Sequence, residues 1–133
     1  DNYELDLEAN NIEGMDIEAF RAYCIAKKGV TEEFPFDEHT LVFKVMGKMF
    51  ALAPLERIPS QVNLKCNPVR AIELRENHDG IIMPGYHMSK THWNTIYIDN
   101  YLPTSLIMEL IDHSYDLVVI GLTKKLKAAL DAL

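Results

Sequence analysis

The feature that most constrains the fold of this 133-residue sequence is a pair of alternating apolar segments separated by two residues. Residues 41–46 and 49–53 flank Gly47-Lys48, and a two-residue loop that begins with glycine is typical of a tight β-hairpin. In this register one face is apolar, and we expect it to lie in the core: Phe43, Val45, Phe50 and Leu52. The opposite face is half polar and carries Lys44, Met46, Met49 and Ala51. The pair therefore predicts an antiparallel sheet that is covered on one side.

A second strand with strict alternation covers residues 61–66, so Val62, Leu64 and Cys66 are expected to point toward the same core. Asn67-Pro68 follows directly, and an N-capping asparagine before a proline predicts a helix from Pro68 to about Asn77. Periodicity and turn residues predict the other elements: a helix over 16–28, an edge strand over 31–36, a strand over 93–98, and helices over 103–111, 115–122 and 124–133 with a break or cap at 112–114.

This order of elements predicts the α+β class, with a single antiparallel sheet and helices packed on one face. The face that the helices leave uncovered would carry mostly polar side chains. We expect these to be Lys44, Asn63, Lys65, Thr95 and Tyr97.

Charge is distributed unevenly along the chain, and this decides which partners the composition excludes. The formal net charge is −7, from 13 basic and 20 acidic residues, but residues 1–14 contribute five acids and no base. The remaining 15 acids and 13 bases nearly balance, so repulsion from phosphate is weak and nucleic acid stays a candidate partner. We therefore separate an acidic N-terminal extension over residues 1–14, disordered or left from an expression vector, from a domain over residues 15–133.

The sequence also gives an expectation about membranes and location. No apolar run is longer than five residues, the length of residues 49–53, whereas a membrane span needs roughly 20. The first residues are acidic, where a signal peptide is basic and then apolar. We expect a cytoplasmic protein without a membrane partner.

No motif in the sequence predicts catalysis, a metal or a cofactor. His87 and His92 are five residues apart and have no third ligand at a standard spacing. There is no glycine-rich phosphate loop, and no serine lies in a nucleophile-elbow context. Cys24 and Cys66 fall on the apolar sides of their elements and are interpreted as small core residues. We expect a non-enzymatic protein; the alternative is an enzyme that acts at Tyr86, His87, Lys90 and His92.

Residues 84–94 read Pro-Gly-Tyr-His-Met-Ser-Lys-Thr-His-Trp-Asn and hold the only tryptophan and two of the five histidines. Aromatic rings give contact area while ring nitrogens and ammonium groups give direction, so this mixture is typical of a recognition surface. Together with Phe34-Pro35-Phe36, residues 63–68, residues 73–76 (Glu-Leu-Arg-Glu) and residues 114–118 (Ser-Tyr-Asp-Leu-Val), this segment resembles the MmcQ/YjbR family of small bacterial proteins. The resemblance covers nearly everything from Met15 to the C-terminus.

That resemblance implies a compact α+β fold, of the kind compared with frataxin-like and type III secretion-chaperone-like domains. It also implies DNA binding through a double-wing arrangement of β-hairpins. Gly47-Lys48 would then form the tip of one wing and residues 84–94 the second contact, and binding would be weak and salt-dependent. The candidate residues for contact with nucleic acid or another partner are Lys48, Lys65, Tyr86, His87, Lys90, His92 and Trp93.

The competing hypothesis, by analogy with secretion chaperones, is a module that binds a protein or peptide. It would use the open sheet face or an exposed sheet edge, and the protein would be a monomer or a homodimer. A purely structural role is the alternative for the aromatic candidates: Trp93 and Tyr86 would be core or rim residues that hold an irregular loop, and the lysines would simply be solvated.

Overall fold

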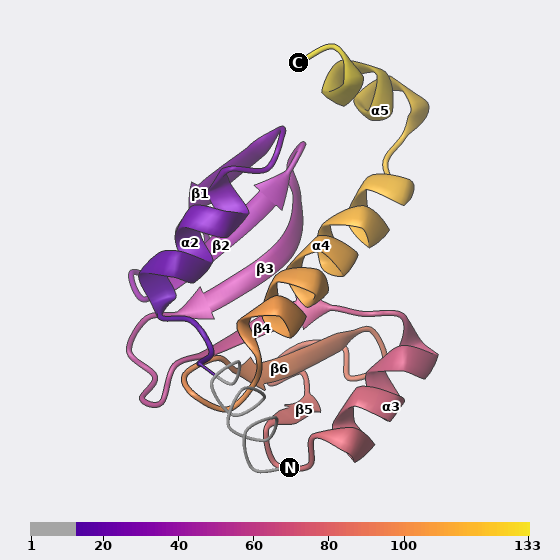
Figure 1. Cartoon of the computed structure of the whole chain (residues 1–133). Helices are drawn as coiled ribbons and strands as arrows, with labels where there is room; N and C mark the ends of the chain where they lie inside the picture. Colours follow the sequence, from indigo (N-terminus) through magenta and orange to yellow (C-terminus); the bar gives the residue numbers. More distant parts are fainter. Residues whose placement is uncertain (1–12) are drawn as a thin grey trace.

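Six antiparallel strands form one sheet in the order β1-β2-β3-β4-β6-β5, and helices cover one of its faces (Figure 1). The computed structural model describes residues 13–133. The strands are β1 (Val30–Glu33), β2 (Thr40–Val45), β3 (Lys48–Pro54), β4 (Gln61–Lys65), β5 (Ile82–Pro84) and β6 (Trp93–Tyr97). The helices are α2 (Ile17–Ile25), α3 (Pro68–Asn77), α4 (Thr104–Ile120) and α5 (Lys124–Asp131).

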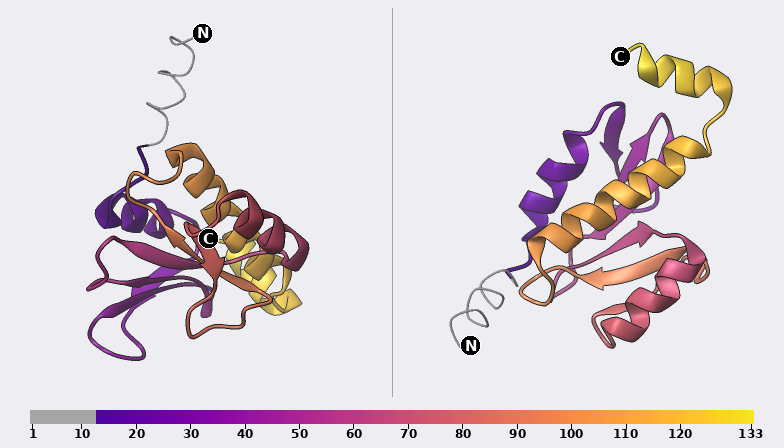
Figure 2. Two further views of the ribbon diagram at one scale, coloured as in Figure 1. Left: turned by 90° about the horizontal axis from the view of Figure 1, so that it is seen from below. Right: turned by 45° about the vertical axis from the view of Figure 1, so that its right-hand side comes forward.

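The helices lie on the same side of the sheet and leave its other face to loops (Figure 2). α2 packs on β1, α4 runs diagonally over β2, β3 and β4, and α3 lies beside β5. The predicted α+β class, with one antiparallel sheet, is confirmed.

Two helix starts follow local signals in the sequence. The side chain of Asp16 accepts a hydrogen bond from the Ala19 N–H at 2.8 Å and caps α2. Asn67 caps α3, because its side-chain oxygen accepts from the N–H groups of Val69 and Arg70 at 3.0 and 3.2 Å. Such side chains satisfy backbone donors that have no partner within the helix, so a few neighbouring residues are enough to place these ends.

The β2–β3 hairpin turns one residue earlier than predicted. Its loop is Met46-Gly47 rather than Gly47-Lys48, because Val45 pairs with Lys48. Both loop residues have positive φ, 50° and 83°, which is the backbone of the two-residue turn whose twist matches that of the strands. Gly47 adopts this conformation without strain. Val45 lies in the main core, as predicted.

A β-bulge in β3 reverses the side-chain alternation expected from the sequence. The pairing register shifts between Phe43 and Lys44, so that Phe50 is an extra residue on β3. Beyond it, Ala51 belongs to the core under the helices and Leu52 packs on the opposite face. The core positions of Phe43 and Phe50 are confirmed. Those predicted for Leu52 and Ala51 are wrong, because one inserted residue moves every later side chain to the other face.

α4 is one continuous helix of 17 residues, so the predicted interruption at 112–114 is wrong. Ser114 lies within this helix, fully buried, and its hydroxyl joins two strands. The Lys65 N–H donates to Ser114 Oγ at 2.9 Å, and Ser114 Oγ donates to the Phe50 carbonyl. Within the described chain, β3 and β4 pair directly at two positions. The serine hydroxyl therefore supplies the next link where the strands diverge.

The main core fills the space between the sheet and the helices. Phe20 of α2 meets Phe43 of β2 edge to face, with ring centres 6.0 Å apart. Cys24 and Cys66 are free and buried, which confirms their interpretation as core residues. Burial raises the pKa of the Cys24 thiol to about 12 and also raises the pKa of Cys66, because a thiolate would lose its hydration there.

The described chain begins with a contact at the far end of the sheet from the hairpin. Gly14 forms an isolated antiparallel bridge with Asp99, and the Met15 N–H donates to the Ile98 carbonyl at 2.8 Å. The acidic extension interpreted over residues 1–14 lies, except for its last two residues, outside the part that the structure describes. Among residues 13–133, none of the helices is long and apolar enough to cross a membrane.

Candidate functional site

The loop between β5 and β6, residues 85–92, is fastened to the sheet by an arginine of α3. Arg75 Nε donates to Asn94 Oδ1 at 2.7 Å, and Arg75 Nη2 donates to the carbonyls of Lys90 and Trp93. The Gly85 N–H donates to the Trp93 carbonyl at 2.8 Å and closes the base of the loop. Hydrogen bonds from a guanidinium are stronger than those between neutral groups, so this 85–92 loop keeps one position.

Trp93 begins β6 on the face that the helices leave uncovered, yet it is only 8% exposed. It packs with Val42 and Leu52 and with the partly buried side chains of Met49 and Met88. This open-face cluster depends on the bulge, which turns Leu52 outward, and on the 85–92 loop, which brings Met88 over the sheet. Trp93 thus holds the loop on the sheet.

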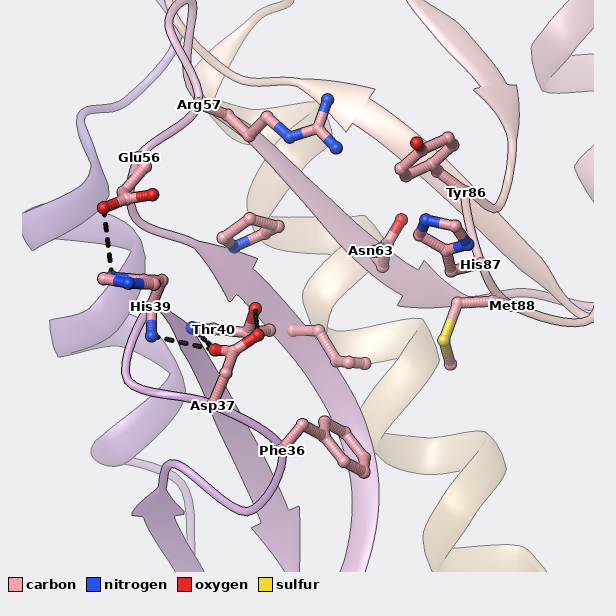
Figure 3. A pocket seen from close by; sticks show the side chains of 12 residues that line it. Phe36, Asp37, His39, Thr40, Glu56, Arg57, Asn63, Tyr86, His87 and Met88 are labelled. Atoms are coloured by element: carbon pink, nitrogen blue, oxygen red, sulfur yellow. Dashed lines mark hydrogen bonds and ion pairs between the residues drawn. The ribbon is translucent and has the colours of Figure 1, made fainter.

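A pocket of about 550 Å³ lies on the same face, and we call it the open-face pocket (Figure 3). Leu52 and Asn63 line it from the strands, and three loops form its walls. In Figure 3, Arg57 and Tyr86 lie on one side of it and Phe36 on the other. The wall side chains are Phe36, Asp37, His39, Glu56, Arg57, Tyr86, His87 and Met88.

Most charges in the wall of this pocket already have partners. The backbone N–H groups of His39 and Thr40 donate hydrogen bonds to the side chain of Asp37. These bonds, the one from His39 first, lower the pKa of the Asp37 carboxyl group. His39 Nδ1 lies 3.1 Å from Glu56 Oε1. Arg57 differs, because no carboxylate of the described residues forms an ion pair with it. Its guanidinium carbon lies 4.8 Å from the centre of the Tyr86 ring, in a cation–π contact.

A second pocket, of about 270 Å³, brings together two lysines that are far apart in the sequence. Lys48 at the start of β3 and Lys65 at the end of β4 both line it, beside the last turn of α4. Among residues 13–133 neither lysine forms an ion pair, whereas Lys44 of β2 pairs with Glu33. Both lysines therefore border one pocket, and neither has an anionic partner among the described residues.

Four more lysines belong to α5 and to the segment that meets α5. α5 starts three residues after Gly121, which lines the second pocket, and it carries Lys124, Lys125 and Lys127. Gly29 lies where α5 meets the hairpin: a Cβ at this position would be 2.6 Å from Leu130 Cδ1 and 3.2 Å from Met46 Sδ. Lys28 Nζ donates to the Asp131 carbonyl at 3.2 Å. We call this region the lysine end; it consists of Lys28, Lys48, Lys65, Lys124, Lys125 and Lys127.

Acidic side chains gather at the opposite end of the strands. The loops before β2 and after β3 and the start of α2 lie there, away from the hairpin (Figure 1). They carry Asp16, Glu18, Asp37, Glu38 and Glu56. Asp116 of α4 and Asp131 of α5 accompany the six lysines. Apart from Arg57, which lies in the same loop as Glu56, these groups are therefore acidic at one end of the strands and basic at the other.

Four of the seven candidate residues form two separate pairs. Lys48 and Lys65 meet at the lysine end. Tyr86 and His87 line the open-face pocket, with ring centres 4.0 Å apart. The two pairs belong to different pockets, so the aromatic and the basic candidates do not share one surface.

The other three candidates take part in the 85–92 loop or follow it directly. Lys90 Nζ donates to the Gly85 carbonyl at 3.3 Å. His92 is exposed, and its carbonyl accepts from the Cys66 N–H at 2.8 Å. Trp93 is buried, which is the structural role that the sequence left open for it.

Sequence analysis did not single out Arg57 or the lysines of α5. Arg57 lies in a linker without periodicity, and nothing local predicts that it reaches Tyr86. The basic run Lys124-Lys125-Leu126-Lys127 is visible as charge, but its approach to the hairpin depends on packing around Gly29.

A further titratable cluster lies where α3 meets α4. Arg70 pairs with Glu109 and lowers the pKa of that carboxyl group. His113 Nε2 accepts a hydrogen bond from the Asn67 N–H at 3.1 Å, which requires the neutral imidazole. Burial, followed by the charge of Arg70, lowers the pKa of His113. In the described part of the chain, no three His, Cys, Asp or Glu side chains are grouped so as to hold a metal ion.

Comparison with known proteins gives a consistent result. The sequence model described as YjbR matches residues 25–117. YjbR of Escherichia coli K12 is 35% identical over 105 residues, which cover 79% of this chain and 88% of that protein. YbdF of Escherichia coli O157:H7 is 38% identical over 92 residues, which cover 69% of this chain and 75% of that protein. Both relatives are described as uncharacterized proteins.

Solved structures with the same fold agree. A Deinococcus radiodurans protein with a DUF419 domain superposes with a TM-score of 0.81 at 38% identity, over 91% of this chain and 90% of that chain. A Pseudomonas syringae protein superposes with a TM-score of 0.66 at 28% identity, over 77% of this chain and 98% of that chain. The match of sequence and of fold over most of the chain shows that this chain belongs to the YjbR family.

Proposed function

We propose that this chain is a non-enzymatic binding domain that binds double-stranded DNA weakly through its lysine end. The observation that carries the proposal is the convergence of Lys48 and Lys65 on one pocket without an anionic partner among the described residues. Phosphate groups recruit such cations, and contact with the backbone alone gives binding without sequence preference.

The charge distribution supports this surface despite the net charge of −7. The segments that form the lysine end carry six lysines, together with the carboxylates of Asp116 and Asp131. Charges are screened over about 8 Å at physiological salt, so the acids at the other end of the strands contribute little to the local potential. The polarity would orient the molecule with the lysine end toward a polyanion.

The positions of the two predicted wings are compatible with this surface. The Met46-Gly47 turn and the 85–92 loop both lie at the end of the sheet where β4 finishes at Lys65. The first wing contributes Lys48 and the second contributes Lys90. Neither wing offers Trp93 for stacking, because the indole is buried, so contact with phosphate groups would dominate.

The proposal predicts how strongly the affinity for DNA depends on salt concentration. If four of the lysines contact phosphates, the slope of log K against log salt is about −3.6. Affinity would then fall roughly 150-fold between about 50 and 200 mM salt. Fluorescence anisotropy with a labelled duplex of arbitrary sequence measures both the affinity and the slope.

Two double variants that change the net charge equally can distinguish binding at the lysine end from a general effect of net charge on DNA affinity. Lys48→Ala with Lys65→Ala should weaken binding at least tenfold at low salt and reduce the slope by about 2, since each phosphate contact contributes about 1. Arg21→Ala with Lys44→Ala removes two cations that are paired with Glu32 and Glu33 and should change affinity less than twofold. Equal losses in the two double variants, or no association at about 20 mM salt, would overturn the proposal.

A protein or peptide partner is the second candidate, and one observation favours it. The loops before β2 and after β3 expose Phe36 (64%) and Ile58 (95%). These loops adjoin, because the Leu55 N–H donates to the His39 carbonyl at 2.7 Å. Exposed apolar side chains on adjacent loops are typical of an interaction surface. A dimer in light scattering that Phe36→Ser with Ile58→Ser abolishes would support this candidate.

A further inference from the structure

We propose that the open-face pocket binds a small organic carboxylate that has a flat apolar body. This pocket lies on the face without helices, between the acid-rich loops and residues 86–88 of the 85–92 loop, and it shares no lining residue with the second pocket. The proposal rests on one amide donor that is open to the pocket, one guanidinium without a carboxylate partner among the described residues, and an apolar lining of suitable size.

The amide donor is Asn63, whose orientation is set by a chain of hydrogen bonds. The Tyr86 N–H donates to Thr95 Oγ1 at 2.9 Å, so this hydroxyl must direct its own hydrogen elsewhere. It donates to Asn63 Oδ1 at 2.5 Å. The oxygen of the Asn63 amide is therefore assigned to the Thr95 side, and the nitrogen to the other side.

The other side of Asn63 is the pocket. On the sheet, Asn63 lies between Thr95 of β6 and Leu52 of β3, and of these two neighbours Leu52 lines the pocket. Asn63 is only 7% exposed, and among residues 13–133 its Nδ2 group has no hydrogen-bond acceptor. No side-chain nitrogen or oxygen of the described residues is both fully buried and unpartnered, so this Nδ2 group is open to the pocket and can donate to a ligand oxygen there.

The guanidinium is that of Arg57, on the wall of the same pocket. It stacks on the Tyr86 ring and has no carboxylate partner in the described residues. The two acids of the wall are already engaged, since Asp37 accepts backbone donors and Glu56 pairs with His39. A ligand carboxylate would accept from Arg57, whose planar fork matches its geometry.

The other side chains that line the pocket indicate that the rest of the ligand is apolar. Leu52, Phe36 and Met88 present apolar surface, and about 550 Å³ lies within the range of small-molecule sites. The body therefore packs against apolar side chains, while one carboxylate oxygen meets Asn63 Nδ2 and the other oxygen meets Arg57.

Benzoate is a suitable probe, with benzamide and benzylamine as the neutral and cationic counterparts. In ¹⁵N-correlated NMR spectra, benzoate should shift the side-chain amide of Asn63 and the backbone signals of Leu52 and residues 86–88, and the shifts should saturate. A probe of nine heavy atoms is expected to bind with a dissociation constant of about 1 mM. Benzamide should bind at least fivefold more weakly, and benzylamine should not shift the Asn63 amide.

Two variants remove the same charge from exposed positions. Arg57→Gln should weaken benzoate at least fivefold, whereas Lys124→Gln, at the start of α5 and outside the pocket lining, should change affinity less than twofold. Both positions are exposed, so neither variant should disturb folding. The proposal is overturned if benzoate at about 50 mM, roughly fifty times the expected dissociation constant, leaves the pocket signals unmoved. It is equally overturned if benzamide matches benzoate or if both variants lose affinity alike.

Discussion

Replacing Ser114 with alanine removes the hydroxyl that links β3 to β4. The Lys65 N–H then loses its acceptor and the Phe50 carbonyl its donor, both close to a fully buried side chain. Leaving a buried backbone group unsatisfied costs about 1–3 kcal/mol, and two groups are affected. Alanine recovers about 0.5 kcal/mol through its higher helix propensity. We expect Ser114→Ala to lower the free energy of unfolding by about 1.5–5.5 kcal/mol, a large share of the 5–15 kcal/mol typical of a domain.

Urea unfolding followed by fluorescence measures this loss, because Trp93 is the single tryptophan and is buried in the folded state. Ser105→Ala is the matched control: it lies exposed in the first turn of α4 and should change stability by less than about 0.5 kcal/mol. Hydrogen exchange gives a local readout, since the Lys65 amide should lose protection in Ser114→Ala. A loss below about 0.5 kcal/mol at an unchanged m-value would refute the reasoning, because it would mean that other groups satisfy both backbone atoms.

Three further outcomes follow from contacts described above. Arg75→Ala should free the 85–92 loop, so limited proteolysis should cleave it at least tenfold faster and the emission of Trp93 should shift to the red. The lowered pKa of His113 means that the unfolded chain binds the proton more readily; stability should therefore be full above pH 6.5 and fall as the pH drops below that value, and His113→Gln should flatten this dependence in urea titrations at pH 5.5 and 7.5. Cys24 and Cys66 should react with a thiol reagent at pH 8 only as fast as the chain unfolds, and rapid labelling of the native protein would contradict their raised pKa values.

Local chemistry explains which elements could be predicted from the sequence. Asp16 and Asn67 cap helices with their own side chains, so a few neighbouring residues contain the whole signal. The positions of Leu52 and Ser114 depend on contacts between elements. The bulge at Phe50 follows from how β3 fits β2, and Ser114 can lie within a helix because the divergence of β3 from β4 leaves its hydroxyl two partners.

The candidate sites likewise include residues that could be identified from the sequence and contacts that could not. Lys48 and Lys65 were identified as separate candidates from their residue type, and only the structure shows that both line one pocket beside the last turn of α4. The link between Tyr86 and Arg57 could not be predicted, because both residues lie on loops and the 85–92 loop takes its course from Arg75 and Trp93. Residue type indicates possible chemistry, while the assembly of a site depends on distant anchors.

The narrow junction between β3 and β4 has a mechanical consequence. The sheet consists of two three-stranded ribbons, β1-β2-β3 and β4-β6-β5, which are joined by two backbone pairs and by the hydroxyl of Ser114. Lys48 belongs to one ribbon and Lys65 to the other, and both line the second pocket. Any rotation of one ribbon against the other would therefore change the distance between these two ammonium groups. The hydrogen bonds of Ser114 on α4 help to fix that distance.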